Sequence, residues 1–138
     1  MTTTFIKNDP LKALQYFEDK MAFTTGPIEL SHALNEKQDI VLVDVRAAED
    51  FEQGHISGAV SLPRGKWSTP SGLRMDKLNV IYCYSQVCHL GAAACVELAR
   101  QGFPVMEMDG GFLVWTKNNL PIVKWFNAPS AYEKAHRS

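Results

Sequence analysis

The feature that most constrains the fold is a short apolar run that ends in a cysteine and is followed by a helix-forming segment. Val80–Tyr82 consists of β-formers in a run too short for a helix, whereas residues 90–101 repeat alanine and leucine at helical spacing until Gly102 ends the pattern. Residues 84–89 between them are turn-like. The stretch therefore predicts a strand, a loop and a helix, with Cys83 at the end of the strand.

Cys83 is placed where a thiol can become a nucleophile. The N-terminus of a helix carries a partial positive charge and unpaired N–H groups, so a loop wrapped there binds anions. Such surroundings lower the pKa of a thiol, and the thiolate is the reactive form of cysteine. The same position also suits a small core residue, because cysteine is among the most buried residue types. This stretch alone does not decide whether Cys83 is a nucleophile or a core residue.

The remainder of the chain alternates between helix and strand patterns, which predicts an α/β layered sheet. Helices are predicted at residues 10–22, 27–37, 47–53 and 90–101, with a short helix after Gly111 that runs through Trp115, and strands at residues 40–43, 59–62, 80–82 and 105–108. Ile40–Val43 contains no polar residue, which is typical of a strand covered on both faces, and we expect it to be the central strand. Ligands bind outside the carboxyl ends of such strands, so Asp44, Pro63 and Cys83 are expected to share one rim.

The two ends of the chain carry apolar residues outside this alternation. Asp9 and Pro10 can start a helix, along one face of which Leu11, Leu14, Phe17 and Met21 recur. Residues 1–23 are therefore predicted to be an N-terminal helical extension packed on a domain of residues 24–123. The tail, residues 124–138, contains Trp125, Phe126 and Tyr132, and we expect it to pack back on the domain.

Charge and cysteine usage narrow the class of partner. The chain has 14 basic and 15 acidic residues and no basic block, which argues against nucleic acid and anionic membranes as partners. No apolar run approaches the length of a membrane span, and the first residues lack the apolar core of a signal peptide. Three cysteines in one short segment suit a reducing compartment, so a cytoplasmic protein is expected. The oligomeric state is left open.

Three stretches, in the same order along the chain, resemble the rhodanese-like domain family. Residues 44–63 look like its first signature, with Asp44-Val45-Arg46 followed by Gly54-His55-Ile56-Ser57-Gly58-Ala59. Residues 82–93 resemble its active-site loop, and Asp109-Gly110-Gly111 with Trp115 and Leu120-Pro121 resembles its closing segment. The resemblance covers Thr24 to Pro121.

This resemblance implies a fold and a reaction. The fold is a twisted, mainly parallel five-stranded sheet with helices on both faces, without cofactor or metal. The reaction is sulfur transfer by a persulfide: the thiolate of Cys83 attacks the outer sulfur of a donor such as thiosulfate and yields the sulfur to a thiol or cyanide. The implied binding residues are Tyr84, Ser85, Gln86, Val87, Cys88 and His89, through their backbone N–H groups, and Arg64.

Other matching positions are interpreted as structural. Asp44 and Arg46 are buried strand-end charges that must be paired, and we expect Arg46 to pair with Asp50 or Glu49. His55, which lies in a glycine-rich bend, is expected to be a hydrogen-bonded brace.

The loop departs from the family pattern because it contains neither Arg nor Lys. His89 is its one ionisable cation, so recognition of an anionic donor is expected to rest on backbone amides and on Arg64, Lys66 or Arg74. Related phosphatases and arsenate reductases have Arg at the position of His89, and a planar guanidinium is what binds a phosphoryl group in a bidentate manner. A phosphatase is therefore disfavoured.

Three alternatives remain. A zinc site of Cys83, Cys88, His89 and Cys95 has suitable ligand types, but Cys95 lies within an alanine-rich helix and is better interpreted as a core residue. A non-catalytic rhodanese-like module that binds or regulates partners is the main alternative to an enzyme. Cys88 is either a second reactive sulfur that resolves the persulfide or a residue that fills the helix packing.

Overall fold

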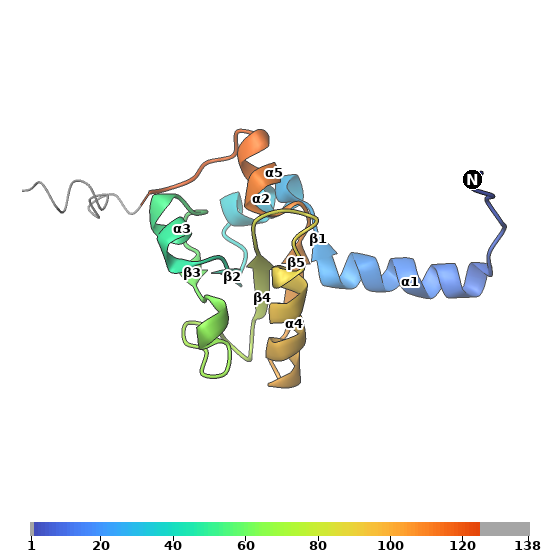
Figure 1. The fold of residues 1–138 in the computed structure, drawn as a ribbon. Helices are drawn as coiled ribbons and strands as arrows, with labels where there is room; N and C mark the ends of the chain where they lie inside the picture. Colours follow the sequence, from blue (N-terminus) through green and yellow to red (C-terminus); the bar gives the residue numbers. More distant parts are fainter. Residues whose placement is uncertain (1, 125–138) are drawn as a thin grey trace, which may run out of the picture.

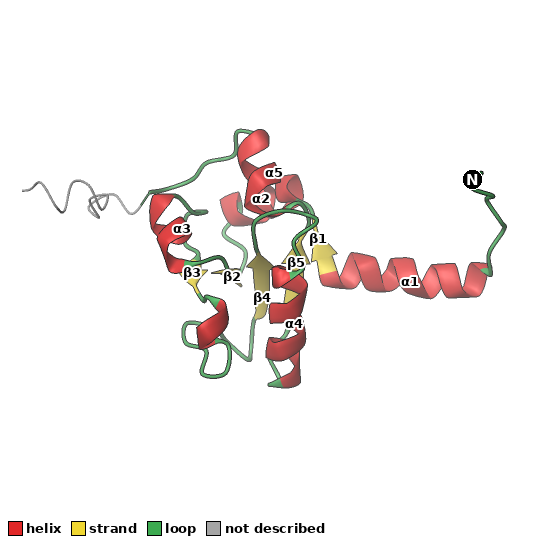
Figure 2. Ribbon diagram, viewed as in Figure 1, coloured by secondary structure: helices red, strands yellow, loops and turns green. Residues whose placement is uncertain are grey.

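The computed structural model describes residues 2–124, which form a five-stranded sheet with helices on both faces (Figures 1 and 2). The strands are β1 (Thr24–Thr25), β2 (Ile40–Asp44), β3 (Val60–Ser61), β4 (Leu78–Tyr82) and β5 (Val105–Met108). Their order is β1-β5-β4-β2-β3, and every neighbouring pair is parallel. The predicted α/β fold with a five-stranded sheet is confirmed.

The centre of the sheet is β4, and the prediction that Ile40–Val43 is the central strand is wrong. β2 lies one place from the centre, between β4 and β3. A run of apolar residues is typical of any strand inside a parallel sheet. Such a run therefore predicts burial without fixing the order of the strands.

The helices divide between the two faces of the sheet. They are α1 (Pro10–Phe23), α2 (Pro27–Asn35), α3 (Ala48–Gln53), α4 (Leu90–Arg100) and α5 (Gly111–Lys117), with a 3-10 helix, η1, at Arg64–Lys66. The core under α4 contains Val43, Val45, Leu62, Trp67, Ile81, Cys83, Ala94 and Leu98. The core on the opposite face, with α2 and α5, contains Leu30, Leu42, Ile56, Val80, Tyr82, Met108 and Trp115. Successive residues of β4 alternate between these cores, and Cys83, the next residue, lies on the α4 side.

Helix α1 forms where the sequence predicts it, but it does not pack on the domain. Pro10 begins the helix, and the Asp9 side chain accepts a hydrogen bond from the N–H of Leu11. None of its residues is buried, and Leu11 and Met21 are 77% and 79% exposed. Figure 1 shows the helix projecting away from the sheet beyond β1. The predicted packing of residues 1–23 on the domain is therefore wrong for a single copy of the chain.

The predicted packing of the tail concerns Trp125, Phe126 and Tyr132, which lie outside the described residues. The last described residues do contact the domain, since Val123 forms an antiparallel bridge with His55. None of the helices in residues 2–124 combines the length and the apolarity that a bilayer crossing requires.

Candidate active site

Cys83 lies at the rim where three strands end. The register of the sheet aligns Asp44 of β2 with Ser61 of β3 on one side and with Tyr82 of β4 on the other. Cys83 follows Tyr82 directly, and it is only 3% exposed. The predicted meeting of strand ends on one rim is confirmed, with the thiol sunk below the surface.

The loop after β4 curls around the Cys83 sulfur. The thiol lies 3.7 Å from the carbonyl oxygen of Ser85 and 3.5 Å from that of Cys88, in position to donate to either. The backbone N–H groups of Gly91 and Ser85 act to lower the pKa of the thiol, because they favour its anion. Of the amides predicted to line the cradle, those of residues 84–89, the Ser85 amide thus favours the anionic sulfur, and α4 adds that of Gly91. The loop and the start of α4 thus surround the sulfur with backbone groups.

Gly91 allows the N-terminus of α4 to approach the sulfur closely. A Cβ atom at Gly91 would lie 3.2 Å from the Cys83 sulfur and in collision with the Glu107 carboxylate. A glycine at the second residue of α4 therefore lets the positive end of the helix dipole face the thiol directly. Sequence analysis did not single out Gly91 or Glu107, although a glycine just inside a predicted helix was a visible signal.

Helix α5 supports the loop from the other side. The N–H groups of Phe112 and Leu113 donate to the carbonyls of Cys83 and Tyr84, at 2.8 and 3.0 Å. Gly111 has φ of +64°, and a Cβ atom there would lie 2.6 to 2.8 Å from the backbone of the loop. The N–H of Gly110 also donates to the Gln86 side chain. Gly111 thus has a direct role, because only glycine fits between α5 and the cysteine loop.

The pKa of the Cys83 thiol is raised, which contradicts the predicted lowering. Burial away from water is the main cause, and the neighbouring Cys88 thiol adds to it. The amides of Gly91 and Ser85 act in the opposite direction but do not outweigh burial. The helix terminus expected from the sequence is present, and desolvation of the sulfur is the factor that the sequence did not reveal.

This balance predicts the pH dependence of thiol reactivity. Alkylation of Cys83 by iodoacetamide, followed by peptide mass mapping, is expected to have its midpoint above the ordinary thiol value of about 8.5, because burial raises the pKa. Cys88→Ser removes a neighbour that raises this pKa, so the midpoint should move to lower pH. Cys95→Ser is the control and should leave it unchanged. A wild-type midpoint below the ordinary value would contradict the raised pKa.

The other predicted binding residues are not all brought to the cradle. Tyr84 turns its hydroxyl to α3, where it donates to Asp50 and accepts from the N–H of Ala47. Val87 is 87% exposed at the tip of the loop. Cys88 is half-buried against the α4-side core. The side chains of Tyr84 and Val87 therefore point to α3 and to solvent, that of Gln86 binds the N–H of Gly110, and the thiol of Cys88 neighbours that of Cys83.

The basic residues outside the loop lie elsewhere. The Arg64 guanidinium stacks over the Trp67 ring, 5.2 Å from its centroid, and these two residues line a hollow of about 360 Å³ with Ala93 and Glu97 of α4. Arg74 forms an exposed ion pair with Asp76. Within residues 2–124, no hydrogen bond or ion pair links Arg64 or Arg74 to the cysteine loop.

A buried ion pair lies beneath the rim. Asp44 and Arg46 are both buried, and the guanidinium donates to the carboxylate at 2.8 Å. Arg46 also donates to the carbonyl of Gly54 at 2.6 Å and lies 3.9 Å from the centroid of the Phe112 ring. The prediction that these strand-end charges are paired is confirmed. The expected partner is wrong, since Arg46 pairs with Asp44 rather than with Asp50 or Glu49.

Tyr82 and His55 complete this support. Burial, together with Asp44, raises the pKa of the Tyr82 hydroxyl, which accepts a hydrogen bond from the N–H of Ile56 at 3.1 Å. Nδ1 of His55 is hydrogen-bonded to the carbonyl of Phe51 at 2.7 Å, and the two rings stack. The interpretation of His55 as a hydrogen-bonded brace is confirmed.

Removal of the Asp44 charge is expected to destabilise the fold. Asp44→Asn leaves the buried guanidinium of Arg46 without its counter-charge, and breaking a buried pair in this way costs about 3–5 kcal/mol. The urea midpoint of unfolding should therefore fall clearly. Asp76→Asn removes one partner of the exposed pair with Arg74 and is the matched control, with little change expected. Equal losses in the two variants would show that the buried pair has no special role.

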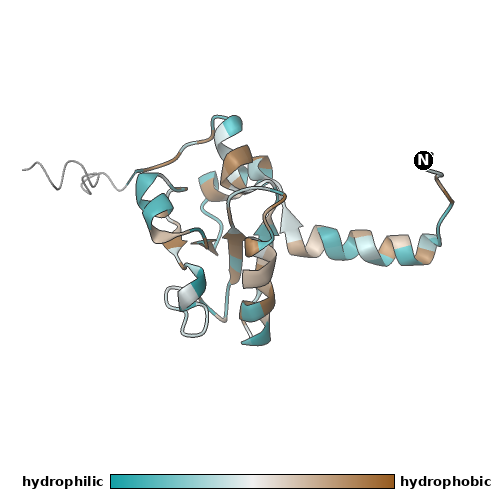
Figure 3. Ribbon diagram, viewed as in Figure 1, coloured by the Kyte–Doolittle hydropathy of each residue, from teal (hydrophilic) through white to brown (hydrophobic). Residues whose placement is uncertain are grey.

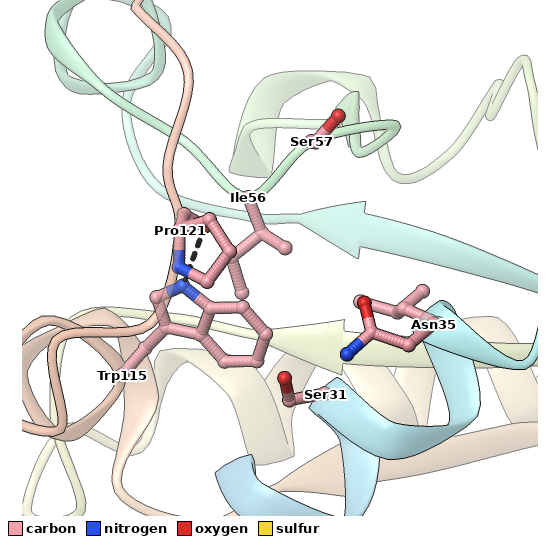
Figure 4. Close-up of a pocket in the computed structure, with 7 residues that line it drawn as sticks. Ser31, Asn35, Ile56, Ser57, Trp115 and Pro121 are labelled. Carbon is pink, nitrogen blue, oxygen red and sulfur yellow. Dashed lines mark hydrogen bonds between the residues drawn. The ribbon is translucent and has the colours of Figure 1, made fainter.

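A separate hollow of about 240 Å³ lies on the α2 face of the sheet. Figure 4 shows Ser31 and Asn35 of α2 across from Ile56 and Trp115, and the Trp115 indole N–H donates to the carbonyl of Pro121 at 3.0 Å. This bond joins the two parts of the closing segment. The hollow belongs to the face opposite the Cys83 thiol, so it is not part of the cradle.

The fold and the rim define a class of α/β domains that hold a cysteine in a loop between the central strand and the next helix. The family model of the rhodanese-like domain matches residues 27–118. The chain belongs to the rhodanese-like domain family, as the motifs of the sequence indicate.

Individual relatives agree with this assignment. A sulfurtransferase from Allochromatium vinosum is 35% identical over 96 residues, which are 68% of this chain and 88% of the relative. The thiosulfate sulfurtransferase GlpE of Pseudomonas fluorescens is 41% identical over 95 residues, 67% of this chain and 84% of its own. The crystal structure of the BH2092 protein from Bacillus halodurans has a TM-score of 0.78 and 27% identity, over 94% of this chain and 100% of that one. The chain is thus similar to sulfurtransferases over about two thirds of its length.

Proposed function

We propose that the protein is a rhodanese-type sulfurtransferase that carries sulfane sulfur as a persulfide on Cys83. The observation that carries the proposal is the position of the Cys83 sulfur beside Gly91, at the N-terminus of α4, where the amides of Gly91 and Ser85 favour its anion. A thiolate or persulfide anion there gains charge-assisted hydrogen bonds and the favourable end of a helix dipole. The similarity to proteins named sulfurtransferases supports the same chemistry.

The reaction has two displacement steps. The thiolate of Cys83 attacks the outer sulfur of a donor such as thiosulfate, a new S–S bond forms, and the donor's own S–S bond breaks to release sulfite. The outer sulfur of the resulting persulfide is then attacked by a thiol or cyanide, and the Cys83 thiolate leaves. The acceptor ends as a persulfide or as thiocyanate, and the cysteine returns to its starting state.

Donor binding relies on the backbone in this protein. The loop contains neither Arg nor Lys, and the Gln86 side chain is occupied by the N–H of Gly110. A hydrogen bond to a charged group is worth about 1.5–3 kcal/mol, so one missing cation weakens binding of a dianion by roughly one to two decades. We therefore place thiosulfate among weakly bound donors, and the partners are a small sulfur donor and a thiol acceptor.

The compartment proposed for this reaction is the cytoplasm. The cysteines of the described residues, Cys83, Cys88 and Cys95, are all free thiols. Free thiols fit a reducing compartment, where a thiol acceptor is also abundant.

The second candidate is a non-catalytic rhodanese-like module. One observation favours it: burial raises the pKa of Cys83, which keeps the resting thiol protonated. A phosphatase is disfavoured, because His89 stands where a guanidinium would have to bind the phosphoryl group. The two candidates differ in one measurable species, the persulfide of Cys83.

Thiosulfate treatment is expected to add one sulfur atom to the wild-type protein. Intact-mass analysis should detect this gain, and a reducing thiol should remove it. Cys83→Ser should keep the fold, as judged by circular dichroism, and show neither the gain nor transfer to cyanide. The matched control, Cys95→Ser, changes a thiol within α4 whose pKa burial raises to about 12, and it should behave as wild type. Wild-type activity in Cys83→Ser would overturn the mechanism.

Cys88 offers a second route for the persulfide. Its carbonyl oxygen lies 3.5 Å from the Cys83 sulfur, so its Cα atom lies within about 6 Å of that sulfur. The Cys88 thiolate attacks the inner sulfur of the persulfide, the inner–outer S–S bond breaks, and hydrosulfide leaves. A Cys83–Cys88 disulfide remains, with the outer sulfur reduced and the two thiols oxidised, and a cellular thiol reopens it.

This route predicts a longer-lived persulfide in Cys88→Ser. After thiosulfate loading and removal of the donor, the extra sulfur should decay more slowly in Cys88→Ser than in wild type or in Cys95→Ser. Non-reducing peptide mapping of the wild type should then show a linked Cys83–Cys88 pair. Equal decay in all three proteins, without the linked peptide, would make Cys88 a packing residue and leave the sulfurtransferase proposal intact.

A further inference from the structure

Glu107 is a half-buried carboxylate in largely apolar surroundings. It is paired in the sheet with Ile81 of β4, which belongs to the core under α4. Its side chain lines the groove between α4 and β5, together with Ala92 and Cys95 of the helix. Figure 3 shows apolar residues along most of α4. A carboxylate withdrawn from water in such a place is costly, which makes Glu107 a candidate for a functional role.

The Glu107 carboxylate has the properties of a base. Among residues 2–124 it takes part in no ion pair, and no hydrogen bond contributes to the shift of its pKa. Burial raises the pKa of Glu107, the charge of Asp109 adds to this, and His89 acts in the opposite direction. A carboxylate with a raised pKa binds a proton more strongly than an exposed one. Glu107 is thus suited to accept a proton.

Glu107 and the Cys83 sulfur both lie next to Gly91. A Cβ atom at Gly91 would be 3.2 Å from the sulfur and 2.5 Å from Oε2 of Glu107. The sulfur and this carboxylate oxygen are therefore within about 6 Å of each other, a separation that one bridging water spans. Because residue 91 is a glycine, it places no side chain between the two groups.

The Cys83 thiol needs a base, because burial keeps it protonated. The thiol is in position to donate to the carbonyls of Ser85 and Cys88. A carbonyl oxygen accepts a hydrogen bond but does not take up the proton at neutral pH. The loop also lacks an Arg or Lys whose charge would stabilise the thiolate. A carboxylate beside the sulfur supplies what the loop does not.

We propose that Glu107 is the proton acceptor of the Cys83 thiol, an inference that rests on the sulfur transfer proposed above. The S–H bond of Cys83 breaks, its electron pair stays on the sulfur, and the proton forms an O–H bond on Glu107. After the sulfur has passed to the acceptor, the Cys83 thiolate takes the proton back. Glu107 becomes neutral as Cys83 becomes anionic, so the two groups together carry one negative charge throughout.

The pH dependence of persulfide loading tests the proposal. The rate of sulfur gain from thiosulfate is followed by intact mass between about pH 5 and 10. The wild type should load at neutral pH, below the pKa of Cys83, because Glu107 takes the proton. Glu107→Gln removes this base, and general bases contribute about 10²–10⁴-fold, so loading at neutral pH should fall at least about a hundredfold. The rate should recover at high pH, where the thiol ionises without a base.

Two further variants are the controls. Glu107→Asp keeps a carboxylate at the site and should retain part of the wild-type rate at neutral pH. Glu97→Gln removes a carboxylate later on α4, which forms an ion pair with Arg100 at 3.1 Å, and it should load as wild type does. Circular dichroism verifies that all variants are folded, and recovery of Glu107→Gln at high pH verifies that its cradle is intact.

Faster loading of Glu107→Gln than of wild type at neutral pH would overturn the proposal, because the carboxylate would then act only as a charge that repels the thiolate and the donor. Equal rates of the two proteins at every pH would overturn it as well, and a loss in His89→Gln instead would assign the proton to that histidine. A wild-type protein that gains no sulfur at any pH is a different result, since it contradicts the sulfurtransferase proposal itself and this inference with it.

Discussion

The buried pair of Asp44 and Arg46 is the interaction on which the rest of the rim depends. Both charges are withdrawn from water, and an unpaired charge at such a depth is strongly unfavourable. The guanidinium therefore holds three elements together: the end of β2 through Asp44, the bend through the carbonyl of Gly54, and α5 through the ring of Phe112. Phe112 in turn donates its N–H to the carbonyl of Cys83. One ion pair on the α2 and α5 face thus positions the loop that holds the thiol on the other face.

Two opposing effects act on the pKa of the Cys83 thiol in the cradle. Burial and the second thiol raise the pKa of Cys83, while the amides of Ser85 and Gly91 favour the anion. A protonated, buried thiol resists oxidation, because oxidation follows thiolate character and exposure. Once an anionic sulfur has formed, the same amides and the terminus of α4 stabilise it without a guanidinium. In the proposed function, the anionic sulfur is therefore stabilised by backbone groups alone.

The sequence predicts the helices and strands well, but it predicts poorly which strands and side chains lie next to each other. Val80–Tyr82 and residues 90–101 predict a strand and a helix because their periodicity is local, and the thiol at their junction is found where expected. Strand order is not local, so Ile40–Val43 was misplaced at the centre. The partner of Arg46 lies only two positions before it, but β2 ends at Asp44 and Arg46 is in the bend that follows, so the alternation of strand residues did not identify the pair.

The remaining errors share one cause, because burial depends on what packs from elsewhere in the chain. Desolvation of Cys83 comes from α4 and from the loop folded over it, and neither effect is visible in the residues next to the thiol. Gly91 and Gly111 likewise take their meaning from atoms that approach them, the Cys83 sulfur in one case and the loop backbone in the other. The sequence alone does not show which glycines lie so close to other atoms that a Cβ atom would collide with them.

Helix α1 shows that the sequence also does not reveal which apolar residues stay exposed. Its spacing predicts an apolar face correctly, but periodicity does not say which surface covers that face. Only the structure shows that α1 ends at Phe23 and β1 begins at Thr24, with no linker between them. The helix therefore projects away from the sheet. An apolar groove of about 380 Å³ lies between α4 and β5, and the Glu107 carboxylate in its lining lies against Gly91. The groove and the thiol cradle therefore share one helix, α4, whose N-terminus faces the sulfur.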